Sequence, residues 1–288
     1  MSRYRLYLGG IMSVYRDKVA LVTGGASGIG RALGAALAAE GARVVLVDIR
    51  RDGVEAACQE IIARGGLARW CELDVADRSA VQAVVDEVYA TEGPIDYLFN
   101  NAGVCLFGEV QEMTSAQWDR LIDINIRGVV HGVEAVYPRM VARGSGHIIN
   151  IASVVGLVPQ AGTVAYSMTK HAVVGLSESL RGEAVHHGVR VSVICPGVID
   201  TDLKNTVDLV RLDRGKLLSS SASLMMSAER CAELTLRGVR WNRALVPVTA
   251  STWLAWWSYR LFPRAFVDWG GPLWMRFVKT RFGITDAQ

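Results

Sequence analysis

Short apolar runs rich in valine and isoleucine alternate along the chain with longer segments of helical periodicity. The apolar runs predict strands over residues 18–23, 43–48, 68–73, 95–100, 146–151, 189–194 and 244–248. The intervening segments predict helices over residues 28–40, 52–64, 77–91, 115–142, 164–187 and 227–239. Uninterrupted apolar strands that alternate with helices are typical of a parallel sheet covered on both faces. We therefore expect an α/β fold built on a doubly wound, seven-stranded parallel sheet.

Composition and length agree with one α/β domain. The 288 residues are 51% hydrophobic and 20% charged, which supplies a large core and excludes a disordered chain. We place the domain at residues 16–250, between an N-terminal extension over 1–15 and a C-terminal extension over 251–288. The five cysteines are odd in number and form no C-x-x-C motif, which favours a reduced intracellular protein without disulfides or a zinc site.

The start of the chain has a short apolar stretch but lacks the small-residue cleavage site of a secretory signal. We therefore expect a cytoplasmic location, and both Met1 and Met12 fit as the first residue. The net charge of +3 is carried by the two ends of the chain, which leaves the middle mildly acidic. This distribution argues against nucleic-acid binding, which needs a basic face on the folded domain.

The C-terminal extension is unusually aromatic. Trp253, Trp256 and Trp257 lie in a predicted helix over 251–262 that is apolar nearly all round, a pattern typical of a buried helix. A second segment, 273–282, reads as a basic amphipathic helix. Both are too short to span a bilayer. Three interpretations stay open: the extension packs over its own pocket or a neighbouring subunit, binds a membrane surface peripherally, or only stabilises the fold.

The turn after the first predicted strand is rich in glycine and precedes a helix. Residues 23–30, T-G-G-A-S-G-I-G, allow a tight turn and a close approach of a pyrophosphate to the helix N-terminus. Asp48 closes the second strand, where a carboxylate accepts hydrogen bonds from a ribose and repels the 2′-phosphate of NADP. We expect NAD rather than NADP, although Arg50 and Arg51 nearby offer charge for that phosphate. The polar loops after the third and fourth strands, expected beside the adenosine, are 74–75 and 100–103.

Three further residues predict acid–base chemistry at the same edge of the sheet. Tyr166 and Lys170 are four residues apart and share one face of a helix. A phenol with a pKa near ~10 is a poor base at neutral pH. A neighbouring ammonium group favours the phenolate and lowers that pKa. Ser153, at the end of the fifth predicted strand, is placed to hydrogen-bond a reacting oxygen.

This combination of motifs resembles the short-chain dehydrogenase/reductase family in its single-domain, Rossmann-like form. The resemblance covers about residues 16–250. It rests on T-G-x3-G-I-G at 23–30, Asp74, N-N-A-G at 100–103, Asn125, Ser153, Y-x3-K at 166–170 and Pro196-Gly197.

The resemblance implies a role for each matching residue. Tyr166 would move the hydroxyl proton, Lys170 would lower the pKa of Tyr166 and bind the nicotinamide ribose, and Ser153 would position the substrate oxygen. Asn125 would hold a water that links Lys170 to solvent. The Thr201 hydroxyl and the backbone near Ile199 would hold the carboxamide, and Asn101 would lie by the adenosine ribose. The implied cofactor contacts are Gly24, Ser27, Gly28, Ile29, Gly30, Asp48, Asp74, Val75, Asn101, Ala102, Gly103, Tyr166, Lys170, Pro196, Gly197, Ile199 and Thr201; no metal site is expected.

The expected reaction is reversible oxidation of a secondary alcohol to a ketone with NAD(H). Apolar loops at 104–110 and 154–162, with a lid over 202–226, suggest a bulky lipophilic substrate. The family also implies a homodimer or homotetramer. The alternatives are an NADP-dependent ketone reductase of the same family and a non-catalytic NAD-binding regulator; a dehydratase or epimerase fits the proton-relay residues less well.

Overall fold

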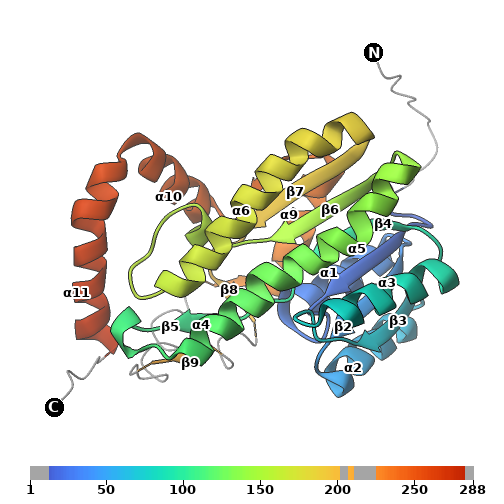
Figure 1. The fold of residues 1–288 in the computed structure, drawn as a ribbon, viewed down its shortest axis with the longest axis horizontal. Helices are drawn as coiled ribbons and strands as arrows, with labels where there is room; N and C mark the ends of the chain where they lie inside the picture. Colours follow the sequence, from blue (N-terminus) through green and yellow to red (C-terminus); the bar gives the residue numbers. More distant parts are fainter. Residues whose placement is uncertain (1–12, 202–206, 211–224, 283–288) are drawn as a thin grey trace.

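A computed structural model describes residues 13–201, 207–210 and 225–282 (Figure 1). Seven parallel strands form the central sheet: β1 (Val19–Thr23), β2 (Arg43–Asp48), β3 (Leu67–Glu72), β4 (Ile95–Asn100), β6 (Gly146–Ile151), β7 (Val189–Cys195) and β11 (Leu245–Pro247). Their order across the sheet is β11-β7-β6-β4-β1-β2-β3. The predicted doubly wound sheet is confirmed, and each strand ends within one residue of its predicted bounds.

Helices cover both faces of this sheet (Figure 1). On one face lie α1 (Gly28–Ala39), α2 (Arg51–Ala63) and α9 (Ala228–Arg240). On the other lie α3 (Arg78–Thr91), α5 (Gly128–Arg143) and α6 (Val164–Ala184), which a 3-10 turn at Val185–His187 extends. Successive side chains of a strand point to opposite faces, so Ala20 and Val22 of β1 join the first core while Val19 and Leu21 join the second.

The helix predicted over 115–142 is interrupted near its middle. It consists of α4 (Ser115–Ile122), a π-helical turn (Asp123–Arg127) and α5. Thr114 and Gln117 form a capping box at its start, since each side chain bonds the backbone of the other residue. Such π-helical turns are rare and concentrate at functional sites.

Two short strand pairs lie outside the central sheet. β5 (Leu106–Phe107) pairs with β9 (Asp208–Leu209), and β8 (Ile199–Asp200) pairs with β10 (Met226–Ser227). Short 3-10 turns occupy Val110–Glu112 and Val154–Gly156. Most of the lid predicted over 202–226 lies outside the described residues. Its described parts, β9 within the segment and the start of β10 at its end, hydrogen-bond to the body of the protein.

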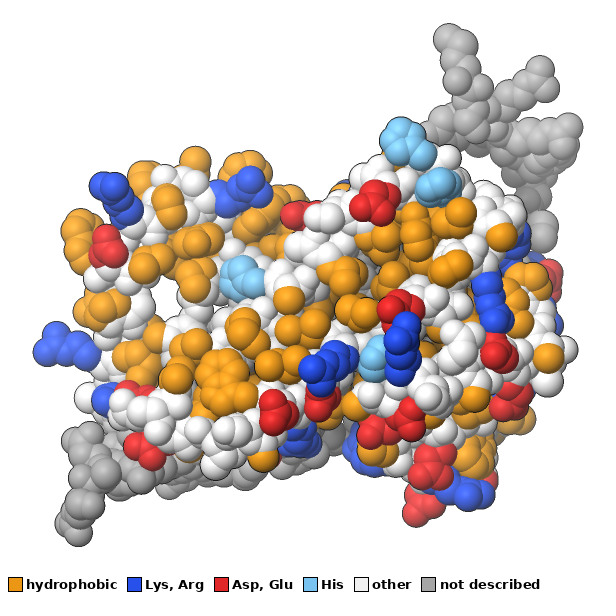
Figure 2. All heavy atoms as spheres, in the orientation of Figure 1, with side chains coloured by type: hydrophobic (Ala, Val, Ile, Leu, Met, Phe, Trp, Pro, Cys, Tyr) orange, Lys and Arg blue, Asp and Glu red, His pale blue; other side chains and the backbone are white. Residues whose placement is uncertain are grey.

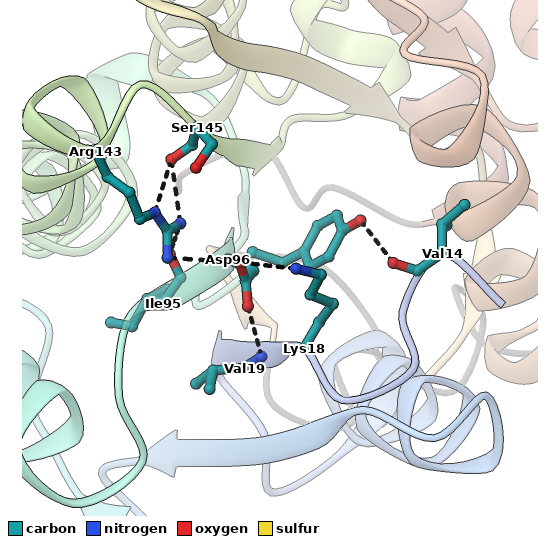
Figure 3. A network of polar contacts seen from close by, with 8 residues as sticks. Val14, Lys18, Val19, Ile95, Asp96, Arg143 and Ser145 are labelled. Atoms are coloured by element: carbon teal, nitrogen blue, oxygen red, sulfur yellow. Dashed lines mark hydrogen bonds and ion pairs between the residues drawn. The ribbon is translucent and has the colours of Figure 1, made fainter. Parts of the chain in front are cut away.

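The amino-terminal edge of the sheet is tied together by a polar network around Asp96 (Figure 3). The Asp96 carboxylate accepts a hydrogen bond from the Val19 N–H at 3.1 Å and lies 3.6 Å from the Lys18 ammonium and 3.5 Å from the Arg143 guanidinium. Arg143 also donates to the Ile95 carbonyl at 2.9 Å. The network thus joins β1, β4 and α5 at the edge opposite the carboxyl ends of the strands, where ligands bind in this type of sheet, so we assign it a structural role.

The first described residues belong to the domain rather than to an extension. Tyr15 is fully buried, and its hydroxyl donates to the Leu236 carbonyl at 2.8 Å. The Ser13 hydroxyl donates to Glu40 at 2.5 Å. The predicted boundary after residue 15 is therefore wrong, because an aromatic side chain close to the end of the chain fills the core between α9 and the sheet.

The C-terminal extension forms α10 (Ala250–Leu261), a π-helical segment (Ala265–Gly270) and α11 (Gly271–Phe282). The expectation that the first of these helices is buried is wrong, since Thr252 is its one fully buried residue. Trp256 and Tyr259 pack on the body, whereas Trp253 and Trp257 stay 40% and 49% exposed. Among the described residues, no helix has both the length and the apolar character needed to cross a membrane.

His147 is a buried histidine held in its neutral form. The Ser192 hydroxyl donates to the Arg243 carbonyl at 2.6 Å, so the His147 Nε2–H donates to Ser192 Oγ at 2.9 Å. The other ring nitrogen is buried without a partner among the described residues. Burial, helped by the positive charges of Arg190 and Arg181, lowers the pKa of His147 to about 3.

Replacing His147 with Gln is expected to make the fold less sensitive to acid. The unfolded chain takes up a proton at His147 below about pH 6.5, whereas the folded chain resists it until about pH 3. The wild type therefore loses about 2 kcal/mol of unfolding free energy through this residue between about pH 7 and pH 5. Urea unfolding at both pH values measures that loss, which His147→Gln removes. The exposed His186, changed to Gln, is the matched control; an unchanged pH dependence in His147→Gln contradicts the prediction.

Candidate active site

A cleft of about 850 Å³ opens at the carboxyl edge of the sheet, where the strand order reverses between β1 and β4. All of the predicted site residues line it except Gly30 and Asn125, which are buried just behind its walls. The predicted residues that line the cleft are Gly24, Ser27, Gly28, Ile29, Asp48, Asp74, Val75, Asn101, Ala102, Gly103, Ser153, Tyr166, Lys170, Pro196, Gly197, Ile199 and Thr201.

The glycine turn between β1 and α1 has a shape that other residues would not allow. Gly24 and Gly28 have φ angles of 68° and 53°, in the left-handed region that glycine adopts most readily. A Cβ on Gly30 would collide with the Gly24 carbonyl. No side chain caps the start of α1, which leaves its first N–H groups at the cleft without a capping partner. This geometry fits the pyrophosphate of a dinucleotide.

Asp48 both holds the glycine turn and faces the cleft. Its Oδ2 accepts from the Ala26 N–H at 3.1 Å, and its Oδ1 accepts from the Arg50 N–H at 2.9 Å. The Arg50 guanidinium bonds Asp48 at 3.3 Å and donates to Ser27 Oγ at 2.7 Å. The positive charge of Arg50 is therefore already paired with a carboxylate at the position where the sequence predicts a ribose.

Asn101 braces the glycine turn. Its side-chain amide donates to the carbonyls of Thr23 at 2.9 Å and Gly24 at 3.3 Å. The Thr23 hydroxyl in turn accepts from the backbone N–H groups of Asn101 at 2.9 Å and Ala102 at 3.0 Å. Asn101 lines the cleft, so its place beside the adenosine ribose stays a prediction, although its side-chain N–H groups are used within the protein. Sequence reasoning missed the bracing role of Thr23, whose one signal was its place at the end of β1.

Ser153 and Tyr166 meet in the cleft. Ser153 begins the 3-10 turn after β6, where its Oγ accepts from the Val155 N–H at 3.4 Å. Tyr166 lies in the first turn of α6. Burial raises the pKa of Tyr166 above its usual value, the Cys105 thiol adds to the rise, and a hydrogen bond with Ser153 opposes it. Desolvation of the phenolate dominates, so the pKa of Tyr166 lies above its usual value, and its lowering by Lys170 stays a prediction.

Lys170 lies one helical turn beyond Tyr166 and is 4% exposed. Its Nζ donates to the Ile151 carbonyl at 3.0 Å and lies 5.7 Å from the centroid of the Tyr166 ring. Burial lowers the pKa of Lys170 to about 8, although the Cys105 and Cys195 thiols raise it slightly. The buried ammonium therefore loses its proton far more readily than an exposed lysine.

Asn125 lies in the π-helical turn between α4 and α5 and is completely buried. Its Oδ1 accepts from the Val104 N–H at 2.8 Å, while its Nδ2 donates to the Val104 carbonyl at 2.9 Å and to Thr169 Oγ1 at 3.1 Å. The side chain thus clamps the loop after β4 against α6, and its predicted role in holding a water beside Lys170 stays a prediction. Thr169 was missed because nothing in its local sequence marks it.

The apolar loops predicted to form the substrate wall point elsewhere. Leu157 and Val158 are buried with α6 and α10, and Leu106 is buried in a small core beside α4. These three side chains therefore do not form the expected substrate wall, because each is buried in a hydrophobic core next to its loop. Val104, from the first of these predicted loops, does line the cleft. Residues that sequence reasoning missed line it from α4 and its π-helical turn: Ala116, Asp119, Arg120, Asp123 and Ile124.

The C-terminal extension touches the outer side of the same loops. Trp274 Nε1 donates to the Ala161 carbonyl at 3.1 Å. The Lys279 ammonium lies 3.0 Å from the Glu109 carboxylate. No residue of α10 or α11 lines the cleft itself, as far as the described chain goes. The extension therefore packs on the loops next to the site without closing over it.

Comparisons with known proteins agree with this site. A family model for short chain dehydrogenase matches residues 18–210. The chain is 41% identical over 197 residues to "Oxidoreductase UcpA" of Salmonella typhimurium, covering 68% of this chain and 74% of that protein. It is 34% identical over 271 residues to "Probable oxidoreductase EphD" of Mycobacterium tuberculosis, covering 91% of this chain. The chain spans only 46% of the length of that relative.

The fold has a close counterpart among solved structures. A short chain dehydrogenase/reductase from Burkholderia phymatum, solved in complex with NAD, superposes with a TM-score of 0.76 at 26% identity. The match covers 95% of this chain and 98% of that one. The family model covers most of the domain, and the glycine turn and the Tyr166–Lys170 pair lie at one cleft. The chain belongs to the short-chain dehydrogenase family.

Proposed function

We propose that this protein interconverts a secondary alcohol and a ketone with NAD(H). The observation that carries the proposal is the convergence of Ser153, Tyr166 and Lys170 in a cleft that also contains the uncapped start of α1. A phenol, a hydroxyl and a buried ammonium suit the transfer of a proton to or from an alcohol oxygen.

The proton handling follows from these three side chains. A bound nicotinamide cofactor supplies the hydride chemistry, held by the start of α1, by Asp48 and by Lys170. In the oxidation direction Tyr166 takes the hydroxyl proton as the carbon gives up its hydride; in reduction Tyr166 returns a proton to the ketone oxygen. The Ser153 hydroxyl donates a hydrogen bond to that oxygen. The Lys170 ammonium, close to the ring, favours the phenolate when Tyr166 ionises.

NAD is the cofactor that the cleft favours over NADP. The Asp48 carboxylate would repel a 2′-phosphate, and the Arg50 charge that would attract one is paired with Asp48 at 3.3 Å. A similar protein from Burkholderia phymatum was crystallised with NAD, which agrees with this preference. Arg50 is also the basis for the alternative, since rotation of its guanidinium away from Asp48 would offer a phosphate ligand.

We propose a bulky lipophilic substrate. Val104, Ala116 and Ile124 contribute apolar surface to the cleft. Asp119 and Arg120 add charge to the same wall, so one polar substituent on an otherwise apolar body would be tolerated. Among the described residues, Asn101 is the one carboxamide that lines the cleft, whereas binding several sugar hydroxyls favours a group of such side chains.

A panel of cyclic and aryl alcohols and of polyols, each assayed with NAD and with NADP, tests the proposal. We expect turnover of the lipophilic alcohols, with kcat/KM at least tenfold higher with NAD. The variant Asp48→Ser should reduce the preference for NAD over NADP, since it removes the charge that repels the 2′-phosphate. Preference for polyols would contradict the substrate class, preference for NADP would contradict the cofactor, and NAD binding without turnover of any alcohol or ketone would instead favour a regulator.

A further inference from the structure

Large exposed hydrophobic side chains are concentrated on the C-terminal extension. Of the 19 such side chains on the described residues, nine lie between positions 253 and 277. We call these nine residues the tail face: Trp253, Leu254, Trp257, Leu261, Phe262, Val267, Trp269, Leu273 and Phe277. Figure 2 shows hydrophobic side chains interspersed with Lys and Arg over the region of α10 and α11. Contiguous apolar surface of this kind marks a binding site for a partner or a membrane.

The tail face is the outer side of helices whose inner side is docked on the domain. On α10, Trp256 and Tyr259 pack on the core formed by α6 and β7. At 100° per residue, Leu254 and Leu261 lie opposite these two side chains, and Trp253 and Trp257 lie on the flank between, where their rings contact Trp256. Because the inner side anchors the helix, the outer side is presented to solvent.

The second helix of the extension repeats this arrangement. On α11, Val278 is fully buried and the Trp274 indole donates to the Ala161 carbonyl. Arg276 is exposed on the opposite side of the helix, and Leu273 and Phe277 are exposed along its flank, where Phe277 contacts the Trp274 ring. The outward side of α11 thus combines apolar and basic side chains, as interfacial helices do.

The charge around the tail face is strongly positive. Arg260, Arg264 and Arg276 are exposed, and Asp268 is the sole acidic residue between positions 250 and 282. Arg264 and Arg276 form no ion pair with any described residue. Two copies of the tail face brought together would set these arginines against each other with only Asp268 to offset them. This positive charge therefore opposes the association of two tail faces and favours binding to an anionic surface.

We propose that the tail face docks the enzyme on the surface of an anionic lipid bilayer. Tryptophan rings lie preferentially at the boundary between headgroups and acyl chains, because one end is apolar and the other hydrogen-bonds. Arginine side chains close to them pair with anionic headgroups. The helices lie in the plane of the interface, with the cleft on the adjoining domain. The proposal does not depend on the substrate or on the cofactor.

Co-sedimentation with vesicles tests this docking. The full-length protein should bind vesicles of phosphatidylglycerol and phosphatidylcholine, bind pure phosphatidylcholine weakly, and release as salt is raised. Trp269→Ala should weaken binding about tenfold, because Trp269 is 72% exposed and would bury its ring in the interface. Arg264→Gln with Arg276→Gln should weaken it roughly 25-fold, about fivefold for each charge.

Matched variants on the body of the protein serve as controls. Trp241→Ala removes a 67% exposed tryptophan from the end of α9, and Arg64→Gln with Arg237→Gln removes two exposed arginines from α9 and the end of α2. All of these should bind vesicles as the wild type does. Failure of the wild type to bind anionic vesicles overturns the proposal, as does equal loss in control and tail variants. Vesicle-independent self-association that Trp269→Ala abolishes would also overturn it and would identify a second copy as the occupant.

Discussion

Replacing Tyr166 with Phe is expected to lower kcat/KM about 10³-fold in both directions of the alcohol–ketone reaction. The change removes one hydroxyl from a ring that is packed in the cleft, so the fold and the cofactor contacts should remain. The variant loses the group that exchanges a proton with the substrate oxygen. General acid–base catalysis of this kind typically contributes a factor of ~10² to 10⁴ in rate. Steady-state assays with the best alcohol of the panel and its ketone measure the effect.

The matched control for this variant is Tyr137→Phe, a partly exposed tyrosine on α5 far from the cleft. Near wild-type turnover in Tyr166→Phe, with an accepted substrate, would contradict the assignment of Tyr166 as the acid–base group.

The pH profile of the wild type gives a second test of this role. Because burial raises the pKa of Tyr166, the phenol is protonated at neutral pH and ready to donate. Ketone reduction should therefore proceed at neutral pH, whereas alcohol oxidation should accelerate as the pH rises.

Replacing Lys170 with Met is expected to lower kcat/KM at least 100-fold. The substitution keeps an unbranched side chain of similar length in α6 but removes the ammonium that lies near the Tyr166 ring. Without that charge the phenolate loses its nearest cation, and the cofactor loses a hydrogen-bond donor. Parallel measurement of kcat, of KM and of the affinity for NAD separates the two losses. Lys18→Met, which changes a partly exposed lysine paired with Asp96, should leave all three unchanged.

Lys170→Met also has a stability signature, which tests the lowered pKa of Lys170. The folded protein releases the Lys170 proton at about pH 8, whereas the unfolded chain holds it to about pH 10.5. In that window the unfolded state binds more protons, so Lys170 makes the fold more stable as the pH rises. Between about pH 8 and pH 9.5 the wild type should gain about 2 kcal/mol relative to the variant. A constant difference across that range would contradict the burial of a charged Lys170.

Much of the fold was predictable because its signals are local. Strands such as Arg43–Asp48 are uninterrupted runs of apolar residues, and such runs are stable only between two layers of helices. The carboxyl ends of parallel strands gather at one edge, which is why residues as distant in sequence as Asp48 and Tyr166 were expected at a single cleft. The structure places both there.

The roles of particular side chains were less predictable. The amide of Asn101 bonds the turn after β1, and that of Asn125 bonds Val104, a partner 21 residues away. The sequence shows that an amide side chain is able to hydrogen-bond, but it does not identify the partner. Leu157 illustrates the same limit for apolar residues. Its hydrophobicity predicts that the side chain is buried, but not whether it is buried in the protein core or against a substrate; the structure buries it in a core.

Taken by itself, the amino-acid sequence determined the parallel sheet, the family and the residues gathered at the cleft, because each depends on spacing along the chain and on the chemistry of single side chains. Only the tertiary structure decided the ionisation of the cleft, where burial raises the pKa of Tyr166 and lowers that of Lys170. It alone also decided that Trp253 and Trp257 remain exposed while Trp256 packs on the body. Burial and hydrogen-bond partners depend on distances between segments far apart in the chain, and those distances exist only once the chain has folded.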